Sequence, residues 1–457
     1  MPDPLDAHKE KVFQKKIKVS MEQEVKKVAS NSIWLLLESI VTMLISLVVG
    51  MISARYLGPN NYGLINRFIP YISLANSICT FGMQSIVTRE ISKADCVETE
   101  ARTLGSAVRF RFILSGLAIV VINVYALIVS VNEGTLLFFI SLAQSISLAF
   151  NAYEIFAYWF HAKLKSKYLA ISMVATSVLL GVWKIVLLIV KADVIFFAVS
   201  TSLQSAVMLV FVLLFFKKEF KPRLKADRGT TRFLIKDSYH LLLTSLGVAI
   251  YGQIDKIMIG SALGNAPLGF YTAAYTLATI WYFIPQALSN SLRGVIFASS
   301  DDPQAYDKKV RFLYLLTVVL GVIAGIGFQV LGKFCIRILY GVEYLNCYPT
   351  LCVLGWVGIF ANIGTAKSIW LIGKGLQKYT KYFTMMGALL NVVLNFILIR
   401  YFGIVGAAIA TVASQFCVQI VFPLFFKECR GCVWNLFKCF TAFKYIKQNT
   451  KGLFHKK

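Results

Sequence analysis

Long apolar stretches, interrupted by glycine, serine and proline, recur along the whole chain. Each is close to the roughly 20 residues that a helix needs to cross the hydrocarbon core of a bilayer. They lack the alternation of polar and apolar residues that is typical of outer-membrane β-barrels. The pattern predicts an all-α integral membrane protein with about twelve transmembrane helices, at residues 32–54, 64–87, 107–130, 135–160, 168–190, 194–216, 239–261, 268–292, 312–331, 348–373, 380–400 and 404–426.

Basic residues gather in alternate connections between these predicted helices. One set of connections, with both chain ends, holds 38 of the 47 lysine and arginine residues, and the other set holds six. The remaining three, Lys184, Lys256 and Lys367, lie inside predicted helices. Because lysine and arginine are retained on the cytoplasmic side of a membrane, the sequence predicts that both termini are cytoplasmic.

The composition excludes an ordinary soluble globule. Of the 457 residues, 57% are hydrophobic and only 15% are charged, whereas soluble domains contain about 45–50% apolar residues. The net charge is +25, but the basic residues lie between apolar stretches, so no nucleic acid partner is expected. The first apolar stretch is too long for a cleaved signal peptide. The basic tail before it is an orientation signal or an amphipathic helix on anionic membrane lipid.

A long basic connection divides the predicted helices into six and six. The sequence therefore predicts five parts: a basic cytoplasmic N-terminal tail at 1–31, an N-lobe at 32–216, a basic cytoplasmic linker at 217–238, a C-lobe at 239–426 and a basic cytoplasmic tail at 427–457.

The same short motif follows the first helix of each half. Leucine and glycine are followed by four residues and a second glycine, at Leu57–Gly63 and at Leu263–Gly269. Gly58 and Gly264 suit a tight turn, and Pro59 stops the preceding helix. Since an even number of helices separates the two copies, the sequence predicts two six-helix lobes related by a parallel pseudo-two-fold repeat.

Several short motifs resemble those of a known family. They are Asn31-Ser32-x-Trp34 at the start of helix one, Ala54-Arg55-Tyr56-Leu57-Gly58-Pro59-x-x-Tyr62-Gly63 at its end, Asp255-x-x-Met258-Ile259-Gly260 and Gly269-x-Tyr271 around helix seven, and Gly403-x-x-Gly406-Ala407-Ala408 before helix twelve. In this order and spacing they resemble the Wzx-type polysaccharide flippases of the MOP superfamily, which also contains the MATE drug exporters. The resemblance spans helices one to twelve.

The resemblance implies a MATE-like, V-shaped pair of lobes that opens alternately to the two sides of the bacterial cytoplasmic membrane. The implied substrate is an undecaprenyl-diphosphate-linked oligosaccharide repeat unit, which is made on the cytoplasmic face and flipped outward for assembly of O-antigen or capsule. Polymerase and chain-length proteins of the same pathway are the implied protein partners. Lys256 and Glu38 match no pattern of the family, so the resemblance gives them no role.

Charged residues inside a membrane normally face protein or a water-filled cavity and therefore mark candidate sites. Lysine and arginine can match the charge of a diphosphate by charge-assisted hydrogen bonds. The candidate substrate-binding residues are Lys256, Lys367, Arg67, Arg55, Lys184 and Arg293. The alternatives are an internal ion pair or snorkelling for Lys256 and Lys367, snorkelling for Lys184, and an orientation or lipid-phosphate role for Arg55 and Arg67.

Three carboxylates, Glu38, Asp255 and Glu154, are the candidate proton or coupling-ion sites, because a buried carboxyl group can change its charge near neutral pH. Structural pairing with the lysines is the alternative. We favour Glu38 and Asp255, since they lie on helices one and seven, the repeat-equivalent pair that lines the cleft in the resembled family.

Uncharged polar residues inside the predicted helices include Tyr251, Asn362, Asn391 and Asn395. Asn391 and Asn395 are four residues apart and share one face of a helix. Such residues either line a large cleft or join helices by hydrogen bonds.

The sequence predicts no enzyme, metal site or cofactor. The chain contains no Walker loop, and its four histidines form no cluster. Cys429-x-x-Cys432 has the spacing of a zinc or redox motif, but the second pair of a zinc site and the context of a redox fold are missing, so free thiols are expected. Cys335 and Cys347 could be joined on the outer side.

Three functions compete. A flippase of lipid-linked oligosaccharides fits best. A MATE-like exporter of small organic cations would favour a cleft dominated by carboxylates, whereas the charges in the membrane are balanced here. A polymerase or glycosyltransferase of the same pathway should carry a large outer loop with catalytic residues, and the predicted outer loops are short.

Overall fold

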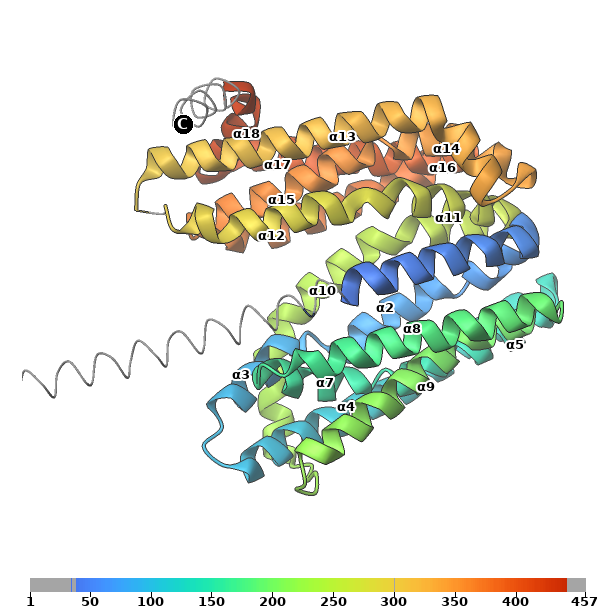
Figure 1. The fold of residues 1–457 in the computed structure, drawn as a ribbon, viewed down its shortest axis with the longest axis vertical. Helices are drawn as coiled ribbons and strands as arrows, with labels where there is room; N and C mark the ends of the chain where they lie inside the picture. The colour runs from blue at the N-terminus through green and yellow to red at the C-terminus, as the bar shows by residue number, and fades with distance from the viewer. Residues whose placement is uncertain (1–33, 35–37, 300, 442–457) are drawn as a thin grey trace, which may run out of the picture. The chain divides into compact units, whose positions relative to one another are not determined.

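The structure is a computed structural model that describes residues 34, 38–299 and 301–441. Its regular secondary structure is helical throughout these residues (Figure 1). Two compact units share the chain. Unit 1 contains the residues up to Gly50 and Ile78–Leu242, and unit 2 contains Met51–Ser77 and the residues from Leu243 onward. The predicted N-terminal tail at 1–31 and residues 442–457 lie outside the described part.

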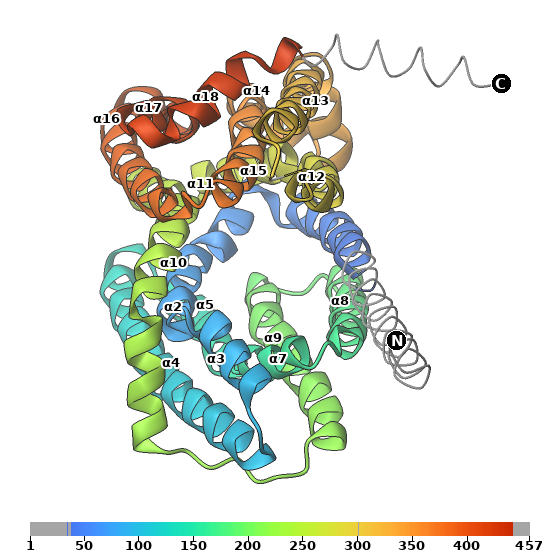
Figure 2. The same ribbon diagram turned by 90° about the vertical axis from the view of Figure 1, so that its left-hand side faces the viewer.

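Unit 1 is built from the first part of a helix at residues 38–66 and from the helices that follow α2. They are α3 (Met83–Lys93), α4 (Val97–Glu133), α5 (Leu136–Ser145), α6 (Ser147–Phe150), α7 (Tyr153–Ala162), α8 (Ser166–Ile189), α9 (Val194–Glu219) and the start of α10 (Arg228–Leu263). Helices α8 and α9 pack along each other, as do α4 and α5 (Figure 2). Trp159, Phe160 and Phe216 form the aromatic centre of the core.

Unit 2 contains the end of the first helix, α2 (Ile69–Thr80) and the rest of α10. Its other elements are α11 (Asn265–Thr279), η1 (Ile280–Tyr282), α12 (Phe283–Phe297), α13 (Pro303–Leu339), η2 (Val342–Cys347), α14 (Tyr348–Leu354), α15 (Val357–Gly373), η3 (Gln377–Tyr379), α16 (Thr380–Phe416), η4 (Cys417–Val421), α17 (Phe422–Phe425), η5 (Lys427–Cys429), α18 (Arg430–Phe437) and η6 (Cys439–Thr441). Helices α13 and α15 pack side by side.

Local sequence signals explain where individual helices begin and end. The Asp302 side chain accepts hydrogen bonds from the backbone N–H groups of Gln304 and Ala305, and Pro303 occupies the first turn of α13. Such a cap satisfies N–H groups that have no partner within the helix. The helix ends before Gly341, which has a left-handed φ of 95°. Residues 303–339 therefore form one uninterrupted helix.

The described residues contain eight helices that are long and apolar enough to span a membrane, or nine if the bent α10 counts as one span. Two of them, Glu38–Lys93 and Gln377–Phe425, have 56 and 49 residues and each contain two of the predicted spans. Gly58 and Gly403 lie inside them with left-handed φ values of 68° and 56°. Helices α11 and α12 are separated by η1, and each is shorter than one crossing. These mergers and breaks explain the different count, and the number twelve stays a prediction.

The connection between α9 and α10 is shorter than the predicted linker at 217–238. Helix α9 continues to Glu219, and α10 begins at Arg228. The linker also packs on α4, because the Lys225 N–H donates to the Ala101 carbonyl and the Ser106 hydroxyl donates to the Asp227 carbonyl. Residues 217–219 and 228–238 of the predicted linker are therefore helical, and three of its eight basic residues, Arg228, Arg232 and Lys236, lie on the first turns of α10.

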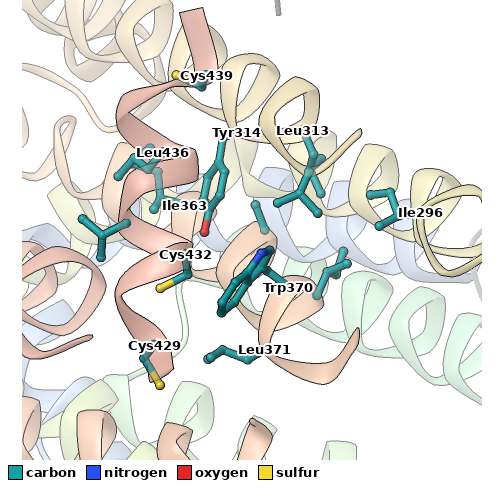
Figure 3. Packing of buried hydrophobic residues seen from close by; sticks show 14 of the residues in the cluster. Ile296, Leu313, Tyr314, Ile363, Trp370, Leu371, Cys429, Cys432, Leu436 and Cys439 are labelled. Atoms are coloured by element: carbon teal, nitrogen blue, oxygen red, sulfur yellow. The ribbon is translucent and has the colours of Figure 1, made fainter. Parts of the chain in front are cut away.

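The segment predicted as a basic tail at 427–457 begins with packed structure. Helix α18 carries Cys432 and Leu436 into an apolar cluster that also contains Tyr314 and Trp370, and Cys429 and Cys439 flank the helix in the same cluster (Figure 3). All nine cysteines are described, and each is a free thiol, Cys335 and Cys347 included. Up to residue 441, the segment is part of the core of unit 2.

The two copies of the repeated motif touch each other inside unit 2. A Cβ atom added at Gly63 would lie 1.7 Å from the Asn265 carbonyl oxygen, and one added at Gly269 would lie 2.0 Å from the Pro59 carbonyl oxygen. Gly58 and Gly264 instead adopt left-handed φ values of 68° and 86°. In both motifs, therefore, the first glycine makes the turn and the second permits close backbone contact.

We expect Gly63→Ala to lower the melting temperature in detergent, because the new methyl group meets backbone atoms. Overpacking of this kind costs about 1–3 kcal/mol of unfolding free energy. Gly116→Ala in α4 is the matched control, since nothing lies within 4 Å of a Cβ atom there, and alanine is favoured over glycine in a helix by about 0.5–1 kcal/mol. Equal melting temperatures for the two variants would contradict the contact.

Candidate functional site

Asp255 is a buried carboxylate in unit 2 that accepts three side-chain hydrogen bonds. The Tyr271 hydroxyl donates over 2.7 Å, the Thr411 hydroxyl over 2.6 Å and the Asn395 amide over 2.6 Å. The Asn395 amide also donates to the Asn391 side-chain oxygen over 3.1 Å. Asn391 and Asn395 therefore share a helix face, as predicted, and that face is turned toward the carboxylate.

The partners of Asp255 come from both sides of a break in α16. Asn395 precedes Gly403 and Thr411 follows it, and Gly403 has a left-handed φ of 56°. The chain then folds back so tightly that a Cβ atom at Gly406 would lie 2.1 Å from the Leu398 carbonyl oxygen. The two glycines thus bring both arms of α16 to Asp255.

Lys256 does not pair with its neighbour in the chain. Within the part of the chain that the structure describes, Lys256 and Asp255 form no ion pair, and the Lys256 ammonium lies 4.9 Å from the centre of the Tyr275 ring. A cation over an aromatic face is attracted by the ring quadrupole without being neutralised. The Lys256 ammonium therefore lies against an aromatic face rather than against a carboxylate.

Lys367 is buried in α15 and is held by the protein itself. Its ammonium donates to the Val418 carbonyl over 2.7 Å and lies 5.0 Å from the centre of the Phe383 ring. Val418 belongs to the π-helical turn η4. In a π-helix the backbone hydrogen bonds join residues five apart rather than four, so the pairing of carbonyl groups differs from that of an α-helix. These contacts tie α15 to the end of α16.

Arg55 lies in the first helix and Arg67 in the bend that follows it, and both belong to unit 2. The Arg67 side chain is only 5% exposed, and its guanidinium donates to the Asn265 side-chain oxygen over 3.2 Å. The Arg55 guanidinium is exposed and donates to the Ile338 carbonyl over 3.3 Å. Arg67 therefore joins the bend after the first repeated motif to Asn265 in the second.

Unit 1 contains a cavity of about 430 Å³ between the first helix, α7, α8 and α9. Glu38 lines it and accepts hydrogen bonds of 3.3 Å from the hydroxyls of Thr42 and Ser39. Tyr153 and Gln204 also line the cavity. The remaining polar walls are hydroxyl groups, those of Thr42, Ser46, Thr176, Ser177, Thr201 and Ser205. The cavity therefore combines one carboxylate with many neutral donors and acceptors.

Glu154 forms an ion pair with Arg111, whose guanidinium lies 3.1 Å from the carboxylate. The Arg111 side chain is 1% exposed, and the Glu154 side chain is 23% exposed. Breaking a buried pair of this kind leaves an uncompensated charge, so the geometry favours a structural role for Glu154. Lys184 is half-buried in α8, and Arg293 is exposed on α12. The predicted site residues therefore lie in several separate places within the two units.

Sequence reasoning missed the partners that complete these sites. Tyr271 and Thr411 lie 16 and 156 residues from Asp255 along the chain, and only the fold of α16 brings Thr411 to it. Arg111 lies near the start of the helix predicted at 107–130, whereas α4 begins ten residues earlier, at Val97, and the Arg111 side chain is buried. The hydroxyl-rich faces of α8 and α9 carried a signal, because serine and threonine recur there at helical spacing.

Residues 28–297, more than half of the chain, match the protein family described as "Polysaccharide biosynthesis protein". The chain belongs to this family. It is 26% identical over 204 residues to the probable low-salt glycan biosynthesis flippase Agl15 of Haloferax volcanii, a match that covers 43% of this chain and 42% of Agl15. It is 23% identical over 360 residues to the lipopolysaccharide biosynthesis protein WzxC of Escherichia coli, a match that covers 76% of this chain and 70% of WzxC. The chain thus spans less than half the length of Agl15.

Solved structures with the same fold belong to the MOP superfamily. The lipid II flippase MurJ in an inward closed conformation superposes with a TM-score of 0.67 at 16% identity, covering 91% of this chain and 93% of MurJ. An inward-facing multidrug resistance MATE family transporter gives a TM-score of 0.63 at 16% identity, and the superposition covers 88% of this chain and 96% of the transporter. The family match thus confirms the resemblance to polysaccharide biosynthesis proteins, and these structures show that the chain shares their fold.

We expect Thr411→Val to lower the melting temperature, because it removes a hydroxyl that donates to the buried Asp255 carboxylate. Loss of a hydrogen bond to a charged group costs about 1.5–3 kcal/mol. Thr350→Val is the matched control, since the Thr350 hydroxyl is buried without a hydrogen-bond partner within the described part of the chain. Thermal unfolding in detergent should show a clear drop for the first variant and no drop for the second. A drop of equal size in both would contradict the assignment.

Proposed function

We propose that the protein flips undecaprenyl-diphosphate-linked oligosaccharide repeat units from the cytoplasmic to the outer face of the bacterial cytoplasmic membrane, for assembly of a surface polysaccharide. The observation that carries the proposal is the cavity in unit 1, which is lined by hydroxyl and amide groups between apolar helices. Polar groups inside a membrane are costly unless they meet protein, water or a polar ligand. A sugar chain that crosses the membrane is such a ligand.

Membership of the polysaccharide biosynthesis family supports the same substrate class. The lipid tail needs no closed pocket, because it can stay in the bilayer while the polar head moves along the protein. The topology that belongs to this proposal has twelve crossings and both termini in the cytoplasm, with basic residues on the cytoplasmic side.

Lys256 is the residue that we assign first to the diphosphate. Its ammonium faces an aromatic ring rather than a carboxylate, so a phosphate oxygen can accept a charge-assisted hydrogen bond from it. Lys367 and Arg67 already donate to protein acceptors, which favours a structural role for both. Arg55, Lys184 and Arg293 are more exposed, and any contact with the substrate would come at the margins of its path.

Asp255 is the residue that we assign first to ion coupling. Its carboxylate accepts hydrogen bonds from two hydroxyl groups and one amide group. Within the described part of the chain, it forms no ion pair. Oxygen atoms of this kind can bind a monovalent cation or share a proton with the carboxylate. Glu38 is the second candidate, because it lines the cavity in unit 1.

A MATE-like exporter of small organic cations is the second candidate function. Its support is the similarity in fold to a multidrug MATE transporter and the carboxylate of Glu38 in the cavity. A cation exporter would use that carboxylate as its main attraction, whereas a flippase would use the neutral walls around it.

Deletion of the gene should cause diphosphate-linked oligosaccharide to accumulate on the cytoplasmic side and surface polymer to disappear, and the parent gene should reverse both effects.

Lys256→Ala should restore polymer at about one tenth of the parent rate or less, since a hydrogen bond to a charged group contributes about 1.5–3 kcal/mol. Lys333→Ala is the matched control, because Lys333 is exposed and lies beside the Tyr348 ring. Normal lipid pools together with new sensitivity to organic cations would reject the flippase and favour the exporter.

Asp255→Asn should remove the dependence of transport on an ion gradient. The purified protein is placed in vesicles, and flipping of a polyprenyl-diphosphate disaccharide is measured with and without an imposed proton or sodium gradient. The parent and Asp193→Asn, an exposed aspartate before α9, should both respond to one of the gradients. If Asp255→Asn responds as strongly as the parent, Asp255 is not the coupling site.

A further inference from the structure

The cavity in unit 1 has an unusual charge composition for a protein that handles a diphosphate-linked substrate. Of the described residues that line it, Glu38 is the only one with a formal charge, and none of the lining residues is a lysine or an arginine. The six cations predicted to bind substrate all lie outside its walls. The cavity is therefore suited to a part of the substrate that carries no negative charge.

We propose that this cavity binds an uncharged sugar residue of the oligosaccharide and discriminates against acidic sugars such as uronates. The proposal rests on the flippase function and adds a substrate class to it: repeat units whose sugar in the cavity is neutral or amino-substituted. The site is formed within unit 1 by the first helix, α7, α8 and α9.

The walls offer hydrogen-bonding groups that the protein itself leaves available. Within the described part of the chain, Ser46, Ser177 and Gln204 have no hydrogen-bond partner, and all three line the cavity. A hydroxyl donates one hydrogen bond and accepts two, and an amide offers both donors and acceptors. Sugar hydroxyl groups have the same dual character, so each can donate to one wall group and accept from another.

Other wall groups already use one hydrogen bond but keep further capacity. The Thr42 hydroxyl shares its one proton between the Glu38 carbonyl, at 2.8 Å, and the Glu38 carboxylate, at 3.3 Å, and the Ser205 hydroxyl donates to the Thr201 carbonyl over 3.4 Å. Their oxygen lone pairs remain free to accept from a ligand. These residues therefore add acceptors to the donors that Gln204 supplies.

Apolar parts of the wall fit the faces of a sugar ring. Tyr153 brings an aromatic ring from α7, and Met173 and Met208 bring thioethers from α8 and α9. Methionine adapts its shape to irregular ligands because its side chain has three rotatable bonds. The volume of about 430 Å³ falls in the range of about 300–1,000 Å³ that is usual for small-molecule sites. The cavity therefore suits a part of an oligosaccharide rather than the whole repeat unit.

Glu38 makes the discrimination. Its carboxylate accepts hydrogen bonds from Thr42 and Ser39, and no described lysine or arginine forms an ion pair with it. A second carboxylate in the same cavity would meet like charge with no cation to offset it, and such repulsion is a common basis of specificity. An amino sugar would instead be attracted.

The test uses the full-length protein in vesicles and two synthetic polyprenyl-diphosphate disaccharides that differ only at the terminal sugar, glucose in one and glucuronate in the other. Substrate that reaches the outside is cut by an added β-glucosidase or β-glucuronidase, neither of which crosses the membrane. The parent protein should flip the glucose lipid at least tenfold faster than the glucuronate lipid. Glu38→Gln should reduce this ratio to threefold or less by raising the rate for glucuronate.

Two further variants keep the test decisive. Glu133→Gln makes the same chemical change outside the cavity and should keep the parent ratio. Gln204→Lys adds a cation to the cavity wall and should reduce the ratio even if Glu38→Gln is inactive, because Gln204 is exposed and its replacement leaves the helix packing intact. A parent protein that flips both lipids equally, or a ratio that neither cavity variant changes, would overturn the proposed selectivity while leaving the flippase function in place. Failure of the parent to flip either lipid would overturn the flippase function and this proposal with it.

Discussion

The close backbone contact between the two repeated motifs is the constraint on which unit 2 depends. Gly63 and Gly269 each lie where a side chain would collide with the backbone of the other motif. The neighbouring contacts follow from this approach. Arg67 reaches Asn265, and the Tyr344 hydroxyl donates to the Ala54 carbonyl over 2.8 Å. The end of the first helix is thereby fixed among residues that lie about 200 to 290 positions later in the chain.

The protein treats its buried charges in two different ways. Asp255 and Lys367 are stabilised by neutral groups, through hydroxyls and an amide in one case and a backbone carbonyl in the other. Arg111 instead has a charged partner in Glu154. A charged group that is held by neutral groups can still gain or lose a proton or bind an ion. A charged group in a buried ion pair loses its partner only at a high cost in free energy. This difference ranks Asp255 above Glu154 as a site where an ion could act.

The sequence allowed the helical membrane fold, the family and the repeated motif to be predicted, because long apolar stretches and glycine turns are local signals. It also predicted the shared face of Asn391 and Asn395. It could not show that Thr411 completes the same site, since that contact depends on the reversal of the chain at Gly403. Nor could it show that the segment after residue 427 packs through Cys432, because Lys427, Arg430 and Lys438, in and around a short helix, resemble the basic residues of a solvated tail.

The exchange of chain segments between the two units has a consequence for how the protein is made. Met51–Ser77 belongs to unit 2, yet it is synthesised before the whole of Ile78–Leu242, which belongs to unit 1. During translation this segment must therefore enter the membrane first. More than 160 further residues are synthesised before the part of unit 2 that Gly63 contacts is made. For the same reason, the chain cannot be divided at the basic linker into two halves that each contain a complete unit, and a gene split there would yield fragments that must find each other before either one is whole.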